Sequence, residues 1–304
     1  MPTTGRTGVV TAPGKRRSRY KRSADPPGMV LMPRDLEVLG HLVRFHRMTG
    51  QQIKEIVPFG SVQTANYRLQ KLWQHGYVER NYWPLSLGSS PAVYRLSHRG
   101  GAALASAIGG DVARYTRSSA TRDQVFLEHA LAVSQVLIAF ELAARRAGHR
   151  LAWQIPADAL DRLPDPLEEE KSIPILPDAI LLYEVGNLKV RAFLEVDRGT
   201  ESLRRVASKV RGCLAYLASG NYQRQYGRRT LRLLIVAPSG RRLASLESAV
   251  TATVQRTSAH LSGEAVDDLK IWSALQENMH SDTVLGDVWS ANGRKARFLD
   301  GQVE

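Results

Sequence analysis

Two short apolar runs followed by a helical pattern, all within residues 177–209, constrain the fold of this chain more than any other stretch. The segment reads PDAILLYEVGNLKVRAFLEVDRGTESLRRVASK. Its first part predicts two β-strands joined by a turn at residues 184–188, and its last part predicts a helix from Thr200 to Leu217. Alternation along the second run puts one set of side chains on one face, Val190, Ala192, Leu194 and Val196, and another on the opposite face, Arg191, Phe193, Glu195 and Asp197.

Carboxylates lie where these strands are expected to end. Glu195 and Asp197 point the same way, roughly 6 to 7 Å apart along the strand. Asp178 begins the first run, and we expect it to meet them across the hairpin. Three neighbouring carboxylates repel one another unless a cation lies between them, so the pattern predicts a site for Mg²⁺.

A lysine on the following helix is expected to join these carboxylates. The predicted buried stripe of that helix comprises Leu203, Val206, Val210, Leu214 and Leu217. Lys209 lies at the border of this stripe, from where its ammonium is expected to reach the acidic side chains. The alternative is that Asp178 is only a turn residue and that Glu195 and Asp197 are a solvated face, neutralised by Arg191, Arg198 and Lys209.

The residues PDA at 177–179, LEVDRGTES at 194–202, Lys209 and Tyr216 resemble the signature of the plasmid-borne replication-relaxation family. The resemblance implies an N-terminal winged helix and a core similar to the PD-(D/E)XK nucleases. It implies that Asp178, Glu195, Asp197 and Lys209 are the catalytic residues and that the three carboxylates hold the metal. Asp197 stands where the nuclease motif has lysine, and Lys209 is expected to take its place.

The resemblance also draws attention to a Glu-His pair on the long helix expected from Asp123 to Gly148. A glutamate on the first helix of such a core sometimes completes the metal shell, which makes Glu128 a candidate. The alternative is that Glu128 and His129 form a structural hydrogen-bonding pair.

The charge of the chain is concentrated in its first part. The net charge is +13; residues 1–122 contain 19 Lys and Arg but 6 Asp and Glu, whereas residues 123–304 contain 23 of each. Such a distribution indicates a polyanionic partner for the first part, and double-stranded DNA is the partner we expect. The alternative is that the basic excess only aids solubility.

Residues 1–28 are predicted to be a disordered basic arm that includes Arg16 and Arg17. Residues 29–100 show three helical patterns and two strands, which resemble a winged helix-turn-helix with its wing at 84–91. Its third helix, capped by Ser61, is expected to enter the major groove. The side chains expected to face DNA are Gln63, Asn66, Tyr67, Gln70 and Lys71, with Arg68 on phosphate. The alternatives are ordinary solvent-facing residues and a module that contacts proteins.

The remaining sequence predicts an α+β protein of two domains. A helix and hinge at 101–122 precede a nuclease-like α/β domain at 123–275, and 276–304 is expected to be a C-terminal tail. Within the α/β domain we expect an acidic loop at 158–170, and Arg198, Arg204 and Arg205 are candidate phosphate contacts. A single Cys213 excludes an internal disulfide and fits a reducing cytosol, and no segment is expected to span a membrane.

The sequence lacks a phosphate-binding GxxxxGK[ST] loop, so ATP use is not expected. It has no His-x-His pair, which excludes the metal site of tyrosine relaxases, and no Cys and His spacing suits zinc. The leading hypothesis is a cytoplasmic DNA-binding protein of a plasmid or other mobile element that acts in replication initiation or in transfer-related processing, with Mg²⁺-dependent nicking as its catalytic version. The alternative is a non-catalytic replication or transcription regulator whose degenerate nuclease-like core serves dimerisation or partner docking. Other replication or transfer proteins and a second copy of the chain are the partners that the sequence permits.

Overall fold

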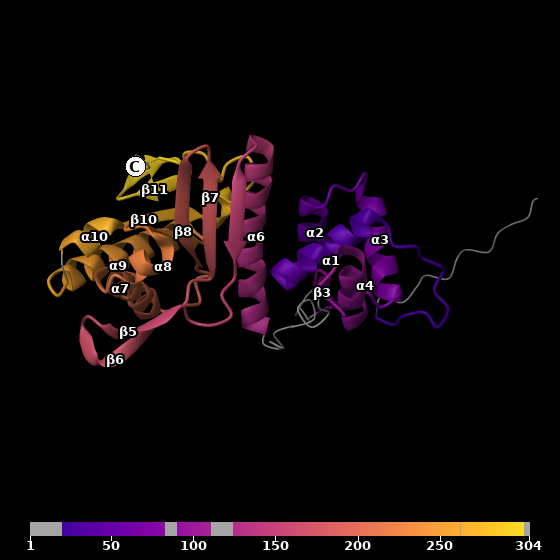
Figure 1. The fold of residues 1–304 in the computed structure, drawn as a ribbon, viewed down its shortest axis with the longest axis horizontal. Helices are drawn as coiled ribbons and strands as arrows, with labels where there is room; N and C mark the ends of the chain where they lie inside the picture. Colours follow the sequence, from indigo (N-terminus) through magenta and orange to yellow (C-terminus); the bar gives the residue numbers. More distant parts are fainter. Residues whose placement is uncertain (1–19, 83–89, 111–123, 262, 301–304) are drawn as a thin grey trace, which may run out of the picture.

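The computed structural model describes residues 20–82, 90–110, 124–261 and 263–300 of the chain. They form an N-terminal module (residues 20–110) and an α/β module (residues 124–300), which lie side by side in Figure 1. The fold is α+β, as the sequence predicts.

Four helices and a small sheet make up the N-terminal module. The helices are α1 (Pro33–Phe45), α2 (Gly50–Ile56), α3 (Val62–Gln74) and α4 (His98–Ile108), and the strands are β1 (Arg47–Thr49), β2 (Val78–Asn81) and β3 (Val93–Leu96), in the order β1-β3-β2. The predicted third helix is confirmed, and the Ser61 hydroxyl caps it by accepting a hydrogen bond from the Thr64 amide. Most of the predicted wing at 84–91 lies outside the described residues, so the winged helix stays a prediction.

The α/β module is built on a seven-stranded sheet in the order β12-β11-β10-β9-β8-β7-β4. Its strands are β4 (Arg150–Gln154), β7 (Ala179–Val185), β8 (Leu188–Val196), β9 (Leu231–Ala237), β10 (Leu269–Leu275), β11 (Trp289–Ala291) and β12 (Arg294–Ala296). Strands β8, β9 and β10 are parallel, and the others pair antiparallel. Helix α6 (Gln124–Ala147) covers one face; the other carries α7 (Leu203–Ala218), α8 (Asn221–Tyr226), α9 (Gly240–Ser258) and α10 (Gly263–Asp268).

The predicted hairpin is formed by β7 and β8. Gly186 has a φ of 56° in the two-residue turn, a conformation that glycine adopts without steric cost. The register pairs Ala179 with Leu194. The predicted alternation is confirmed, since Leu194 packs in the core on the α6 side and Phe193 packs in the core on the α7 side.

Two segments differ from the sequence-based expectations. The region expected to be an acidic loop forms a second hairpin, β5 (Asp161–Asp165) and β6 (Glu168–Ile175), because Arg211 of α7 binds Asp165 and Ile173 packs against Gly212. The region expected to be a tail supplies a 3₁₀ turn (Gln276–Asn278), β11 and β12. Trp289 and Phe298 anchor it, since they are 1% and 0% exposed.

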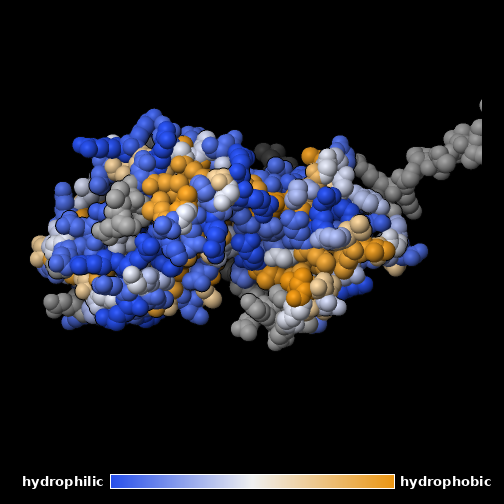
Figure 2. Space-filling view, turned by 45° about the horizontal axis from the view of Figure 1, so that its top comes forward, coloured by the Kyte–Doolittle hydropathy of each residue, from blue (hydrophilic) through white to orange (hydrophobic). Residues whose placement is uncertain are grey.

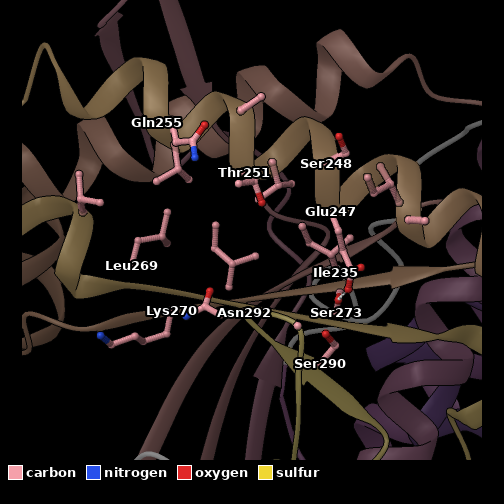
Figure 3. Close-up of a pocket in the computed structure, with 18 of the residues that line it drawn as sticks. Ile235, Glu247, Ser248, Thr251, Gln255, Leu269, Lys270, Ser273, Ser290 and Asn292 are labelled. Carbon is pink, nitrogen blue, oxygen red and sulfur yellow. Dashed lines mark hydrogen bonds between the residues drawn. The ribbon is translucent and has the colours of Figure 1, made fainter.

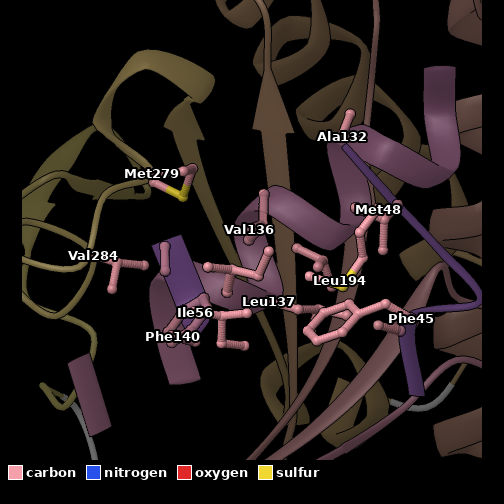
Figure 4. Packing of buried hydrophobic residues seen from close by; sticks show 14 of the residues in the cluster. Phe45, Met48, Ile56, Ala132, Val136, Leu137, Phe140, Leu194, Met279 and Val284 are labelled. Carbon is pink, nitrogen blue, oxygen red and sulfur yellow. The ribbon is translucent and has the colours of Figure 1, made fainter. Parts of the chain in front are cut away.

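Helix α6 joins the two modules into one hydrophobic core. Figure 4 shows Phe45, Met48 and Ile56 of the N-terminal module packed near Leu137 and Phe140 of α6. Polar contacts cross the same boundary: the Gln52 side-chain amide donates to the Leu131 carbonyl at 2.8 Å, and Arg44 donates to Glu141 at 3.0 Å. Residues 126–147 are apolar and long enough to span a membrane by composition alone, but packing against both modules accounts for this apolar character.

Candidate functional site

Two carboxylates and one ammonium converge at the ends of β7 and β8. The Lys209 Nζ atom lies 2.5 Å from Glu195 Oε2 and 3.9 Å from Asp178 Oδ1. The predicted approach of Lys209 to these carboxylates is therefore confirmed. We call Asp178, Glu195 and Lys209 the acidic–lysine cluster.

The hairpin and α7 position this cluster. Asp178 immediately precedes β7; its amide donates to the Leu194 carbonyl and its Oδ2 accepts a hydrogen bond from the Val196 amide at 2.8 Å. These bonds hold Asp178 opposite Glu195. Ser202 caps α7, and Val206 and Val210 pack against the sheet, which places Lys209 over the strand end.

Burial and mutual charge shift the pKa values of the cluster. Burial and the Asp178 charge raise the pKa of Glu195 to about 8, against the opposing effect of Lys209. Burial disfavours the ionised form of Asp178, but hydrogen bonding from His129 and the charge of Lys209 outweigh it and lower the pKa of Asp178. Burial likewise opposes the charge on Lys209, yet Glu195 and Asp178 raise its pKa above the ordinary value.

Asp197 is not part of this cluster. Its carboxylate accepts hydrogen bonds from Arg242 Nε at 2.8 Å and Arg242 Nη2 at 2.9 Å, and from the Gly199 amide at 2.8 Å. Arg242 lies in the first turn of α9 and also donates to the Glu201 carbonyl. Asp197, expected to be a metal ligand, is thus held by an arginine and ties the loop after β8 to α9.

Three contacts were not foreseen in the sequence. His129 Nε2 lies 3.0 Å from Asp178 Oδ1, whereas the neighbouring Glu128, the expected candidate, binds Arg198. Glu201 Oε2 lies 3.6 Å from Lys209 Nζ, so a third carboxylate approaches the ammonium. The signal in the sequence was the position of Glu128-His129 on the long helix. The resemblance implies that this pair borders the site, and His129 does contact Asp178, whereas a metal-binding role of Glu128 stays a prediction.

The interpretation of these acidic residues as a solvated face is wrong. Glu195 is 9% exposed and Asp197 is 4% exposed. Arg191, expected to neutralise them in that interpretation, instead stacks over the ring of Tyr226 at 4.3 Å. A buried carboxylate requires a specific partner, which Lys209 and Arg242 supply.

The pair Asp178 and Glu195 has the ligand type that a small hard cation prefers. The expected set of three carboxylates is not formed, because Asp197 is bound to Arg242. Mg²⁺ is commonly held by one or two carboxylates together with waters and substrate phosphates. Asp178 Oδ1 and Glu195 Oε2 already converge on one cation, the Lys209 ammonium. Within the described ranges, no group of three His, Cys, Asp or Glu side chains is arranged to hold a metal. The free space beside Glu195 and Lys209 is about 10 Å³, room for about one water molecule.

A larger cavity lies elsewhere in the α/β module (Figure 3). It has a volume of about 880 Å³ and lies between α9 and the strands β10 and β11. Its lining includes Glu247, Thr251, Gln255, Lys270 and Asn292, and none of the acidic–lysine cluster. The Glu247 carboxylate accepts a hydrogen bond from the Ser273 hydroxyl at 2.6 Å, so it already has a partner within the cavity wall.

The predicted DNA-facing residues of α3 divide into two groups. Gln63, Asn66 and Tyr67 are exposed. Arg68, expected to bind phosphate, instead forms a salt bridge with buried Asp35 and donates to the Val30 carbonyl, so it secures α3 to α1.

The other two are also engaged: Gln70 accepts from Arg80 at 2.7 Å, and Lys71 donates to the Gly28 carbonyl at 3.0 Å. Arg16 and Arg17 lie outside the described residues. The face drawn in Figure 2 shows an apolar area on the N-terminal module. The exposed large hydrophobic side chains in the described segment before α1 are Tyr20, Val30 and Met32, at 70%, 78% and 51%.

A family model described as replication-relaxation matches residues 39–231. No curated protein matches the chain significantly. Among solved structures, the restriction endonuclease FokI bound to DNA matches with a TM-score of 0.29 and 8% identity, over 81% of this chain and 43% of that enzyme. The same endonuclease without DNA matches with a TM-score of 0.27 and 9% identity, over 81% and 42%. The chain thus spans less than half the length of that enzyme, and a likeness this distant does not establish a shared activity.

Proposed function

The chain belongs to the replication-relaxation family, and from this premise we propose that it binds double-stranded DNA of a plasmid or other mobile element and nicks one strand during replication or transfer. The N-terminal module and the basic arm locate the DNA, and the acidic–lysine cluster acts on the phosphodiester. This role places the protein in the cytoplasm, beside other replication or transfer proteins.

The observation that supports the catalytic part of the proposal is the convergence of Asp178 Oδ1 and Glu195 Oε2 on Lys209 Nζ, at 3.9 and 2.5 Å. Holding the buried Glu195 and the largely buried Asp178 beside a lysine is costly to a fold, because each charge must be removed from water. A pair of carboxylates can hold Mg²⁺ for phosphodiester cleavage, and a neighbouring ammonium can stabilise charge on the phosphate.

In this proposal Asp178 and Glu195 hold Mg²⁺, which when bound supplies an activated water and stabilises charge on the phosphate. His129 fixes the orientation of the Asp178 carboxylate through its 3.0 Å contact. Lys209 would donate a hydrogen bond to a phosphate oxygen of the bound strand. Asp197 and Arg242 keep the loop after β8 in place and touch neither metal nor substrate.

The test is conversion of supercoiled plasmid to the open circle in Mg²⁺ or Mn²⁺. Asp178→Asn and Glu195→Gln are expected to abolish nicking, because each removes a negative ligand while keeping side-chain shape. The matched control is Glu184→Gln on β7, whose carboxylate binds Lys189 and Arg150 away from the cluster. Nicking that persists in both cluster variants, or that never occurs in the parent, rejects the catalytic proposal.

A second candidate function is a DNA-binding replication or transcription regulator without turnover, in which the α/β module serves dimerisation or partner docking. It is favoured by the position of Lys209, which occupies the space between the carboxylates, and by the engagement of Asp197 with Arg242. A parent protein that binds DNA but never nicks it, in any divalent metal and with any replication extract, supports this candidate.

A further inference from the structure

The exposed large apolar side chains of the α/β module belong to the segments that form or contact the acidic–lysine cluster. Among its described residues the exposed large hydrophobic side chains are Phe126, Leu176 and Leu203, at 58%, 44% and 36%. Phe126 lies one helical turn before His129, which contacts Asp178, and residues at this spacing share a helix face. Leu176 is two residues before Asp178, and Leu203 is two residues after Glu201, which approaches Lys209. We call these three residues the apolar rim.

The exposure of Leu203 is unexpected, because the sequence places this residue in the buried stripe of α7. The sequence assigns Leu203 to the packed face of α7, yet the stripe that is buried there consists of Val206, Val210 and Leu214. Leaving a Phe and two Leu in water costs hydrophobic free energy that packing would recover. Exposed apolar groups concentrated at one site indicate a surface that meets a ligand.

Positive charge lies beside the rim. Arg198, Arg204 and Arg205 occupy the loop after β8 and the first turn of α7, next to Leu203. Arg204 is exposed. The Arg205 side chain is 68% exposed and pairs with Glu201 at 3.3 Å, and Arg198 pairs with Glu128, so a phosphate would exchange with a carboxylate at these two arginines. The rim therefore combines the guanidinium of Arg204 for phosphate with groups for an apolar face.

Duplex DNA does not match this combination, because its base faces are stacked inside the helix and only phosphates, sugars and base edges are accessible. An unpaired strand offers phosphates and open base faces together. Single-strand binding sites pair a basic surface with side chains on which bases rest.

We infer that the apolar rim binds the bases of an unpaired DNA strand and presents its phosphate to the acidic–lysine cluster. This inference rests on the proposed function, because it names the form of DNA that the same site accepts. The N-terminal module engages the duplex, and the rim engages a neighbouring melted segment.

The test measures binding of the full-length protein, in EDTA so that no metal is present, to a fluorescent thymidine oligonucleotide and to a fluorescent duplex at one salt concentration. The double variant Phe126→Ser/Leu203→Ser is expected to weaken single-strand affinity by about tenfold or more, as for loss of one or two stacked bases, and to leave duplex affinity within about twofold. The control is Ile108→Ser on α4 of the N-terminal module, a residue that is 65% exposed, and it is expected to leave both affinities unchanged.

A second variant, Phe126→Trp, keeps an aromatic face and is expected to retain or increase single-strand affinity. Equal weakening for both DNA forms, no weakening for either, or a loss in Phe126→Trp equal to that in the double variant overturns the inference. A change in oligomeric mass with unchanged DNA affinity also overturns it, because the rim would then bind a second copy of the chain. Asp178→Asn is expected to retain single-strand binding while losing nicking. Absence of nicking by the parent protein rejects the proposed cleavage and leaves this binding result unaffected.

Discussion

The Asp197–Arg242 pair yields the sharpest stability prediction. Substituting Asp197→Asn preserves shape but removes the charge, and the new amide nitrogen must face Arg242 or the Gly199 amide, both of which are donors. The Asp197 side chain is 3% exposed and that of Arg242 is 18% exposed, so water does not replace the lost bonds. Loss of one partner of a buried, hydrogen-bonded pair costs about 3 to 5 kcal/mol, and we expect about 3 kcal/mol here because Arg242 retains some solvent contact.

The assay is urea denaturation followed by circular dichroism. With an m-value of about 1 to 3 kcal/mol per molar urea, a loss of about 3 kcal/mol lowers the midpoint by about 1 M or more, with m unchanged. The control is Glu184→Gln, whose partners Lys189 and Arg150 are 51% and 87% exposed, and it should leave the urea midpoint nearly unchanged.

A loss below about 1 kcal/mol in Asp197→Asn refutes the structural role. If nicking disappeared at the same time, Asp197 would belong to the reacting site after all. The partner variant Arg242→Met completes a double-mutant cycle, and a coupling energy near zero also contradicts the proposed pairing.

Three further predictions concern pH, α3 and the basic arm. Burial raises the pKa of Glu195 from 4.5 to about 8, so the folded protein keeps a proton that the unfolded chain has lost, and the free energy of unfolding falls as pH rises from about 5 to 8. Urea titrations in EDTA should show that the difference in free energy of unfolding between the parent and Glu195→Gln falls over this range. Free energies of the two proteins that run parallel with pH contradict the prediction. Arg68→Ala should destabilise the protein by about 2 to 4 kcal/mol by leaving buried Asp35 unpaired, whereas a phosphate-binding role would weaken DNA affinity at unchanged stability. Deletion of residues 1–19 should reduce the slope of log affinity against log salt by about 0.9 per lost phosphate contact, and an unchanged slope removes the arm from the interface.

The β7–β8 hairpin and α7 were predictable because their signals are local. Alternation fixes which face Phe193 and Leu194 occupy, Gly186 fixes the turn, and the spacing of Val206 and Val210 fixes the packed face of α7. Together these features bring Asp178, Glu195 and Lys209 to one point without any information from distant parts of the chain.

Contacts between distant segments were not predictable. Arg242 reaches Asp197 across 45 positions, and Arg211 reaches Asp165 across 46. The sequence predicted loops in these polar segments because their strands are stabilised by tertiary packing and not by local pattern. The β5–β6 hairpin packs on α7, and β11 pairs with β10 while Trp289 is buried in the core. The composition and local pattern of these segments therefore do not indicate which distant residues they contact.

Two ion pairs account for the departure of this chain from the motif that the resemblance implies. The position after Val196 carries Asp197 in place of lysine, and the arginine that answers it, Arg242, belongs to α9. Lys209 of α7, expected to take the place of that lysine, has its ammonium 2.5 Å from Glu195. Asp197→Lys alone would therefore not restore the motif, because it would place a second cation against the partly exposed Arg242 and release the loop that leads into α7, where Lys209 is anchored.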